Sequence, residues 1–253
     1  TVKLQNAEGQ QFCGWVRVGH RPAENTLSVT VSESLLPVLP EVLARIKNLF
    51  DLYCEPKAVY ETLQVMNTLQ PGLCVLGTRL PGCFNVFEMS VRAVLGQQIT
   101  VKAASTLAAR LVAVYGTQVQ TGIEGLTHSF PAPAAILALG ENISEHLGKL
   151  GIISARANTI YQLARVLADE KNDFGFCGNP EEEMQKLQAI RGIGSWTAQY
   201  IAMRAMGWPD AFLPTDAGIK KALPDHTPKE LQVLSEAWRP WRSYATVNLW
   251  NTL

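Results

Sequence analysis

The chain has 253 residues, of which 47% are hydrophobic, and its 22 acidic and 22 basic side chains give no net charge at pH 7. This composition indicates a globular protein that buries one large core or several smaller ones. No apolar run is long enough to span a membrane and no signal peptide opens the chain, so we expect a cytoplasmic protein without membrane contact. Zero net charge argues against nucleic-acid binding through a broad basic surface, but not against binding through backbone amides and a local basic patch.

The cysteines indicate neither a disulfide framework nor a metal site. They are odd in number, widely spaced and lack any C-x-x-C pair. The four histidines are equally scattered, so we expect them in surface positions or with ordinary polar partners. The five cysteines are Cys13, Cys54, Cys74, Cys83 and Cys177.

The first fifty residues predict a small α+β part. Residues 11–18 and 27–32 alternate in hydrophobicity and are rich in β-branched side chains, which favours two strands. Residues 19–25 between them are rich in turn formers. Residues 36–52 then show the apolar spacing of a helix that would cover this sheet.

From Pro56 onward the pattern is almost wholly helical, with short loops between the helices. Pro56 suits the first turn of a helix, and Thr100 can cap the helix that follows it. The predicted helices span residues 57–66, 84–97, 101–115, 132–139, 143–150, 154–170, 180–190, 196–206, 216–223, 229–238 and 240–251.

A tight turn joins the predicted helices 180–190 and 196–206. Its glycines, Gly192 and Gly194, permit positive φ and leave the amides of the turn and of the next helix bare. Such amides at the positive end of a helix can grip a phosphate, and Ser195 or Thr197 can cap the helix or add a hydroxyl to the phosphate site. This pattern is typical of helix-hairpin-helix motifs that hold a nucleic-acid backbone. The alternative is an ordinary αα-hairpin whose glycines serve packing alone.

A short helix follows Pro214, and Thr215 or Asp216 can cap it. A carboxylate at this point, shortly after a phosphate-gripping turn, is suited to stabilising positive charge on a sugar. The alternative is that Asp216 acts only as a helix cap. The flanking Asp210 and Asp225 are expected to be solvated. The basic side chains that gather in this part of the chain are Lys220, Lys221, Arg239 and Arg242.

Three consecutive stretches, GIGSWTAQYIAMRAMG, FLPTDAGIKK and WRPWRSYATVNLW, resemble the helix-hairpin-helix DNA glycosylases, and most closely their AlkA-type 3-methyladenine branch. The likeness covers nearly the whole chain. It implies a mainly α fold with a small α+β N-terminal part, and two helical domains that flank a cleft. Residues 49–52, 71–73, 80–83 and 91–97 match this family as well.

The resemblance also implies a division of the chain into domains. Residues 1–53 would form a partial N-terminal α+β domain whose first strands are missing. Residues 85–209 would form a central helical domain that ends in the helix-hairpin-helix motif. Residues 54–84 would join residues 210–253 in a second helical domain that carries the catalytic aspartate.

In function, the resemblance implies a monomeric, monofunctional DNA glycosylase of the bacterial nucleoid, which flips alkylated purines out of double-stranded DNA and hydrolyses the N-glycosidic bond. Family members that also nick the strand carry a lysine where this chain has Trp196, so we expect no β-lyase activity. No cysteine follows Cys177, which excludes the iron–sulfur site of such relatives. The alternatives are a glycosylase for oxidised or deaminated bases, a non-catalytic DNA-binding module and a helical protein-interaction module.

The site residues that the resemblance implies fall into five groups. The wedge that fills the gap left by a flipped base is leucine in the AlkA-type branch but Gln98 here. We expect glutamine to insert and hydrogen-bond the orphaned partner base; the alternative is that it only lies in a loop. No cofactor is required, although a structural Na⁺ or K⁺ at the hairpin is expected. Asp216 is the catalytic carboxylate; Trp196, Tyr200 and Trp250 form the base pocket; the amides of Gly192, Gly194 and Thr197 bind the DNA backbone; and the carbonyls of Gln188, Ile190 and Ile193 hold the cation. Trp208, Trp238 and Trp241 are left to the core or an interface.

Overall fold

The computed structural model describes residues 1–6, 8–168 and 179–253. It is mostly helical with a small strand-containing part in the first 31 residues, as predicted. The chain divides into two compact units. Unit 1 comprises Thr1–Arg45 and Gln98–Ala168, and unit 2 comprises Ile46–Gln97 with the described residues from 179 onward. The three-part domain division inferred from the sequence stays a prediction.

The strands of unit 1 differ in detail from the prediction. The stretch 11–18 is broken at Trp15, because the Trp15 amide donates to the Ser32 hydroxyl (3.0 Å) while its carbonyl accepts from the Ser32 amide (3.0 Å). The first strand and a ladder of two-residue strands were not predicted. The first strand does alternate, with Val2 and Leu4 buried, but it has only four residues, and a two-residue strand is too short to show a period. The antiparallel pairs are β1 (Val2–Gln5) with β2 (Gln11–Gly14), β3 (Val16–Arg21) with β4 (Thr26–Val31), and β5 (Thr117–Gln118) with β6 (His128–Ser129).

Helix α4 of unit 1 has the bounds that the sequence predicts, and the Thr100 hydroxyl caps it by accepting from the Ala103 amide at 3.2 Å. The predicted helix 36–52 is instead a 3₁₀ turn followed by α1, which continues into unit 2. The predicted helix 154–170 is observed to Leu167, and its expected end lies outside the described residues, as does Cys177. The helices are η1 (Pro22–Glu24), η2 (Glu33–Val38), α1 (Leu39–Leu49), α4 (Val101–Tyr115), α5 (Pro133–Leu137), η4 (Gly140–Asn142), α6 (Ile143–Gly148) and α7 (Ser154–Leu167).

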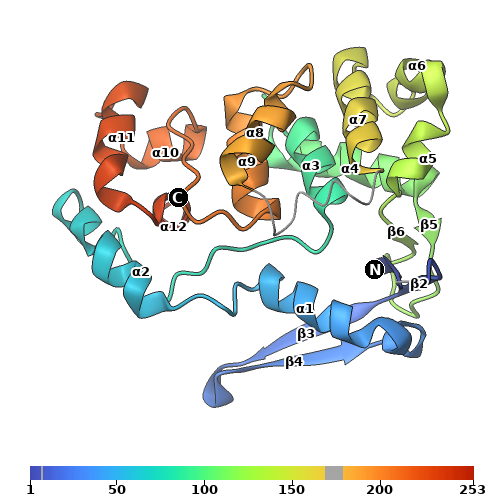
Figure 1. Ribbon diagram of the computed structural model, residues 1–253, viewed down its shortest axis with the longest axis horizontal. Coiled ribbons are helices and arrows are strands. Elements are labelled where there is room, and N and C mark those ends of the chain that lie inside the picture. The colour runs from blue at the N-terminus through green and yellow to red at the C-terminus, as the bar shows by residue number, and fades with distance from the viewer. Residues whose placement is uncertain (7, 169–178) are drawn as a thin grey trace. The chain divides into compact units, whose positions relative to one another are not determined.

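Unit 2 is built from helices whose starts carry strong local signals. The Asn85 side chain caps α3, and Thr227 with Glu230 forms a reciprocal capping box at α11. Helix α9 packs against both α3 and α8 (Figure 1). The helices are α2 (Pro56–Leu63), η3 (Gln64–Thr68), α3 (Val86–Leu95), α8 (Pro180–Gln188), α9 (Ser195–Ala205), α10 (Ala217–Ala222), α11 (Pro228–Leu234), η5 (Ser235–Trp238) and α12 (Arg242–Trp250).

One buried core of unit 2 joins the segment before α3 to the C-terminal helices, with Trp238 among its largest side chains. Polar contacts reinforce it. The Asp51 carboxylate accepts from the Leu80 amide (2.8 Å) and from the Tyr244 hydroxyl (2.9 Å). Burial raises the pKa of Tyr244 far above its ordinary value, so this phenol stays protonated and acts as the donor. The Asn248 side chain accepts from the Val75 amide at 3.0 Å.

None of the helices in the described ranges is long and apolar enough to cross a membrane.

Candidate active site

The turn between α8 and α9 has the open geometry that the sequence predicts. Gly192 has a φ of +96°, in the region that favours glycine, and Gly194 is the N-cap residue of α9. A Cβ added at Gly194 would meet nothing within 4 Å, so space lies in front of this helix start. No side chain of the described part of the chain caps α9, and the expectation that Ser195 or Thr197 does so is wrong.

The Thr197 hydroxyl does not cap α9 because it faces the end of α3. Gln97 Nε2 donates to Thr197 Oγ1 at 2.9 Å and to the Gly192 carbonyl at 3.0 Å, which fixes the hairpin to the segment that follows α3. The next residue, Gln98, is exposed and has a φ of +55°, a backbone conformation that is unusual for a residue other than glycine. Sequence reasoning missed Gln97, although it belongs to one of the matched stretches.

Asp216 is the N-cap residue of α10, as expected. Its Oδ1 atom accepts from the amides of Gly218 (2.8 Å) and Ile219 (3.1 Å), and the residue is 9% exposed. A helix cap explains only half of its contacts, however. Two side chains from other helices also donate to the same carboxylate.

These two donors are indoles of the expected base pocket. Trp196 Nε1 of α9 donates to Asp216 Oδ2 at 3.0 Å, and Trp250 Nε1 of α12 donates to Oδ1 at 2.8 Å. Four N–H groups from three helices therefore hold the carboxylate. Such charge-assisted bonds are stronger than neutral ones and fix the orientation of both oxygens.

The third expected pocket residue, Tyr200, packs against both indoles. Its ring stacks on Trp196 with centroids 5.1 Å apart and planes 9° apart, and it lies 6.3 Å from the Trp250 ring. All three rings are partly buried against the core of unit 2. The Arg204 guanidinium lies 5.9 Å from the centroid of the Tyr200 ring. The structure thus brings the predicted aromatic trio together around the predicted carboxylate.

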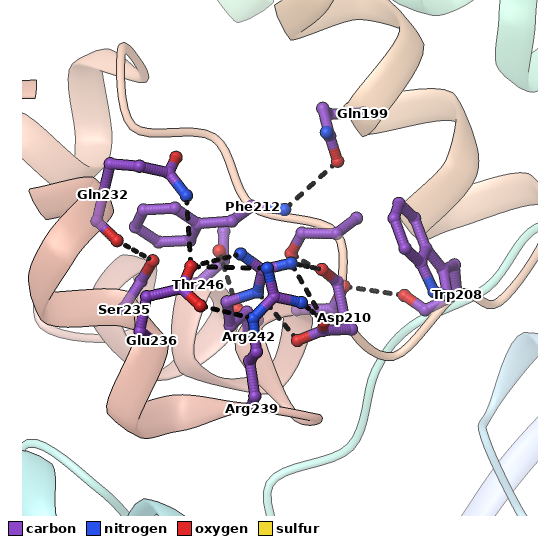
Figure 2. A network of polar contacts seen from close by, with 12 residues as sticks. Gln199, Trp208, Asp210, Phe212, Gln232, Ser235, Glu236, Arg239, Arg242 and Thr246 are labelled. Carbon is purple, nitrogen blue, oxygen red and sulfur yellow. Dashed lines mark hydrogen bonds and ion pairs between the residues drawn. The ribbon is translucent and has the colours of Figure 1, made fainter. Parts of the chain in front are cut away.

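A buried ion pair anchors the loop that leads to Asp216, and Figure 2 shows its network. Arg242 Nε donates to Asp210 Oδ1 at 2.7 Å and Nη2 to Oδ2 at 2.9 Å, while Arg239 also contacts this carboxylate. The expectation that Asp210 is solvated is therefore wrong. The expected basic patch is also smaller than predicted, because Arg239 and Arg242 are both paired with acidic side chains in this network. The hydrogen bond to Glu236 raises the pKa of Arg239 above its ordinary value.

Further hydrogen bonds fix the backbone of the same loop. The Ser243 hydroxyl lies within hydrogen-bond distance of the carbonyls of Trp208 (2.7 Å) and Ala211 (3.1 Å). The Phe212 amide donates to Gln199 Oε1 at 3.2 Å (Figure 2). Trp238 is buried, and Trp208 and Trp241 pack against the core, as predicted. Lys220, Lys221 and Asp225 are exposed.

The expected cation site lies at the end of α8. The Ile190 carbonyl accepts from the Ile193 amide at 3.0 Å, so an ion would share this oxygen with the turn. Carbonyls at the negative end of a helix are ligands of the type that a monovalent cation requires. The other two carbonyl oxygens would come from Gln188, the last residue of α8, and from Ile193. This site stays a prediction.

Two family models cover most of the chain. Residues 1–85 match the AlkA N-terminal domain, and residues 91–242 match the HhH-GPD superfamily base excision DNA repair proteins. The chain belongs to the HhH-GPD superfamily. The resemblance inferred from the sequence is therefore confirmed. Residues 188–216 of the candidate site lie inside the second match, whereas Trp250 lies beyond it.

A curated relative supports this assignment, and solved structures share the fold. The chain is 38% identical over 230 residues to DNA-3-methyladenine glycosylase 2 of Escherichia coli. The aligned residues cover 91% of this chain and 78% of that protein. Its fold is similar to a 3-methyladenine DNA glycosylase from Archaeoglobus fulgidus (TM-score 0.74, 21% identity, 98% and 88% covered). It is also similar to a DNA complex of an 8-oxoguanine glycosylase/lyase from Clostridium acetobutylicum (TM-score 0.72, 17% identity, 99% and 86% covered).

Proposed function

We propose that this protein is a monofunctional DNA glycosylase that excises alkylated purines, of the 3-methyladenine and 7-methylguanine type, from double-stranded DNA. Membership of the HhH-GPD superfamily and the 38% identity to an alkylpurine glycosylase support this proposal. The observation that carries it is the position of the Asp216 carboxylate, which accepts hydrogen bonds from the two indoles of the partly buried aromatic trio.

The aromatic trio suits the substrate. A purine methylated at a ring nitrogen is electron-poor and positively charged, and aromatic faces attract such a base by stacking and by cation–π interaction. Because the target bond is unreachable inside the duplex, the nucleotide must first be flipped into the pocket. Trp196, Tyr200 and Trp250 would then contact the flipped base.

Asp216 supplies the chemistry that such a substrate still needs. A cationic base is already a good leaving group, so little general-acid help is required. The sugar develops oxocarbenium character as the C1′–N bond breaks, and a preorganised carboxylate beside it stabilises that charge or orients water. Trp196 stands where a strand-nicking relative would carry its lysine, which supports hydrolysis without β-lyase chemistry.

The hairpin would hold the DNA backbone while this happens. The amides of Gly192, Gly194 and Thr197 lie at the turn and at the uncapped start of α9, where the helix dipole favours a phosphate. Gln98 would fill the gap left by the flipped base. A monovalent cation on the carbonyls at the end of α8 would stabilise the turn. Each of these roles is part of the proposal, as is action as a monomer.

The test is incubation of the protein with a duplex that carries one 3-methyladenine or 7-methylguanine, in parallel with an 8-oxoguanine duplex. The freed base is identified by mass, and the strand is checked on a denaturing gel before and after alkali. We expect release of the methylated purine from a strand that stays intact until alkali is added. Release of 8-oxoguanine alone would favour an oxidised-base enzyme, cleavage without alkali would show a lyase, and binding without release would leave only a DNA-binding module.

A further inference from the structure

Gly218 occupies the point where Asp216 and Trp250 come closest. It is the second residue of α10, and its amide donates to Asp216 Oδ1 at 2.8 Å. Its φ does not lie in the positive region, so any residue could adopt its backbone conformation. Glycine is also a poor helix former. Neither the backbone nor helix propensity therefore explains a glycine at this position.

Space explains it instead. A Cβ built on Gly218 would lie 2.7 Å from Trp250 Cδ1 and 3.0 Å from Trp250 Nε1, distances at which something must shift. It would also lie 3.0 Å from Asp216 Oδ1. The first contact is with a rigid ring, not with the end of a flexible side chain, so the whole indole would have to move. The bare α-carbon is what allows Trp250 Nε1 to lie 2.8 Å from the carboxylate.

We propose that Gly218 is a positioning residue for base excision, which sets the spacing between the Trp250 indole and the Asp216 carboxylate. A side chain at 218 would displace the indole, remove one of the four donors that orient the carboxylate, and shift an aromatic wall of the base pocket. This inference rests on the proposed function of Asp216. It predicts a loss in the rate of base release while binding of the DNA backbone, which lies with the α8–α9 turn, is kept.

The first experiment is a double-mutant cycle. Single-turnover base release from a methylated duplex is measured for wild type, Gly218→Ala, Trp250→Phe and the double variant, with the dissociation constant for the same duplex. Phenylalanine keeps an aromatic ring but lacks the indole N–H that donates to Asp216. The matched control is Gly148→Ala, because a Cβ at Gly148 would meet nothing within 4 Å.

We expect Gly218→Ala to slow base release on the order of 10- to 100-fold, the effect of losing a hydrogen bond to a charged group. Duplex affinity should change by less than about twofold. Gly148→Ala should leave both the rate of base release and the duplex affinity unchanged, because its methyl group would meet nothing within 4 Å. In the Trp250→Phe background, Gly218→Ala should slow base release by less than about a further twofold, since the hydrogen bond to Asp216 that it disturbs is already gone. A rate within twofold of wild type, an equal loss in both backgrounds or a parallel loss of duplex binding would overturn the inference.

A second measurement does not depend on activity. The Trp250 indole N–H resonance in a ¹⁵N-correlated NMR spectrum reports its hydrogen bond to Asp216, and it is assigned from its absence in Trp250→Phe. We expect this resonance to move in Gly218→Ala and to stay in place in Gly148→Ala. An unmoved resonance would overturn the geometric argument. If wild type released no methylated base, the proposed function would fail, while this spectrum would still decide what Gly218 does.

Discussion

Replacing Arg242 by methionine should destabilise the protein strongly, because the buried Asp210 carboxylate then loses its buried cationic partner. The Arg242 and Asp210 side chains are 7% and 11% exposed, and Arg242 makes two bonds to the carboxylate and a third to the Asp210 carbonyl. Breaking a buried pair from one side costs about 3–5 kcal/mol. Arg239 still contacts Asp210 but is half exposed, so we expect the lower end of this range.

For a chain of this size, a loss of about 3 kcal/mol lowers the melting temperature by roughly 6–12 °C. The assay is thermal and urea unfolding followed by circular dichroism. Methionine retains much of the packing of the arginine stem. The control is Lys149→Met, which removes an exposed ion pair and should leave the midpoint unchanged. A second variant, Arg242→Met with Asp210→Asn, should recover part of the loss because no buried charge is left unpaired.

Base release should fall together with stability in Arg242→Met, since Asp210 anchors the loop that leads to Asp216. A variant that unfolds within about 1 kcal/mol of wild type would refute the reasoning, because a buried carboxylate left with only the half-exposed Arg239 should destabilise the protein by more than that.

Two further predictions concern the DNA-binding elements. Gln97→Ala removes the bonds to the Gly192 carbonyl and the Thr197 hydroxyl, so duplex affinity measured by fluorescence anisotropy should fall on the order of tenfold, whereas the exposed control Gln185→Ala should bind normally. Unchanged duplex binding in Gln97→Ala would show that these two hydrogen bonds are not needed for DNA binding. Gln98→Ala should slow base release from duplex DNA but not from a single strand, because only a duplex leaves a gap to fill; equal effects on both substrates would exclude a wedge.

Local signals account for what the sequence predicted well. Glycine spacing marked the turn at Gly192, and a proline followed by an acidic residue marked the start of α10 at Asp216. Both features depend on residues within a few positions of one another, so propensity and capping rules reach them. The joint placement of the aromatic trio came from family resemblance, because the tilted ring contact between Tyr200 and Trp250 leaves no local pattern.

Tertiary contacts account for what the sequence missed. The partner of Asp210 is 32 residues away, and the position of Asp210 outside the family motif suggested a solvated side chain. Gln97 reaches a carbonyl 95 residues away. The role of Gly218 emerges only when Trp250, from another helix, is seen against it. Spacing along the chain carries no information on such encounters.

The most direct test of the account is single-turnover base release by Asp216→Asn, with duplex binding measured on the same preparation. Asparagine keeps the size of the side chain and one oxygen that can accept from the α10 amides, but it removes the negative charge. We predict that release of the methylated purine is abolished while the variant still binds the duplex. Retained base release by Asp216→Asn would contradict the central claim that this carboxylate stabilises the sugar during excision.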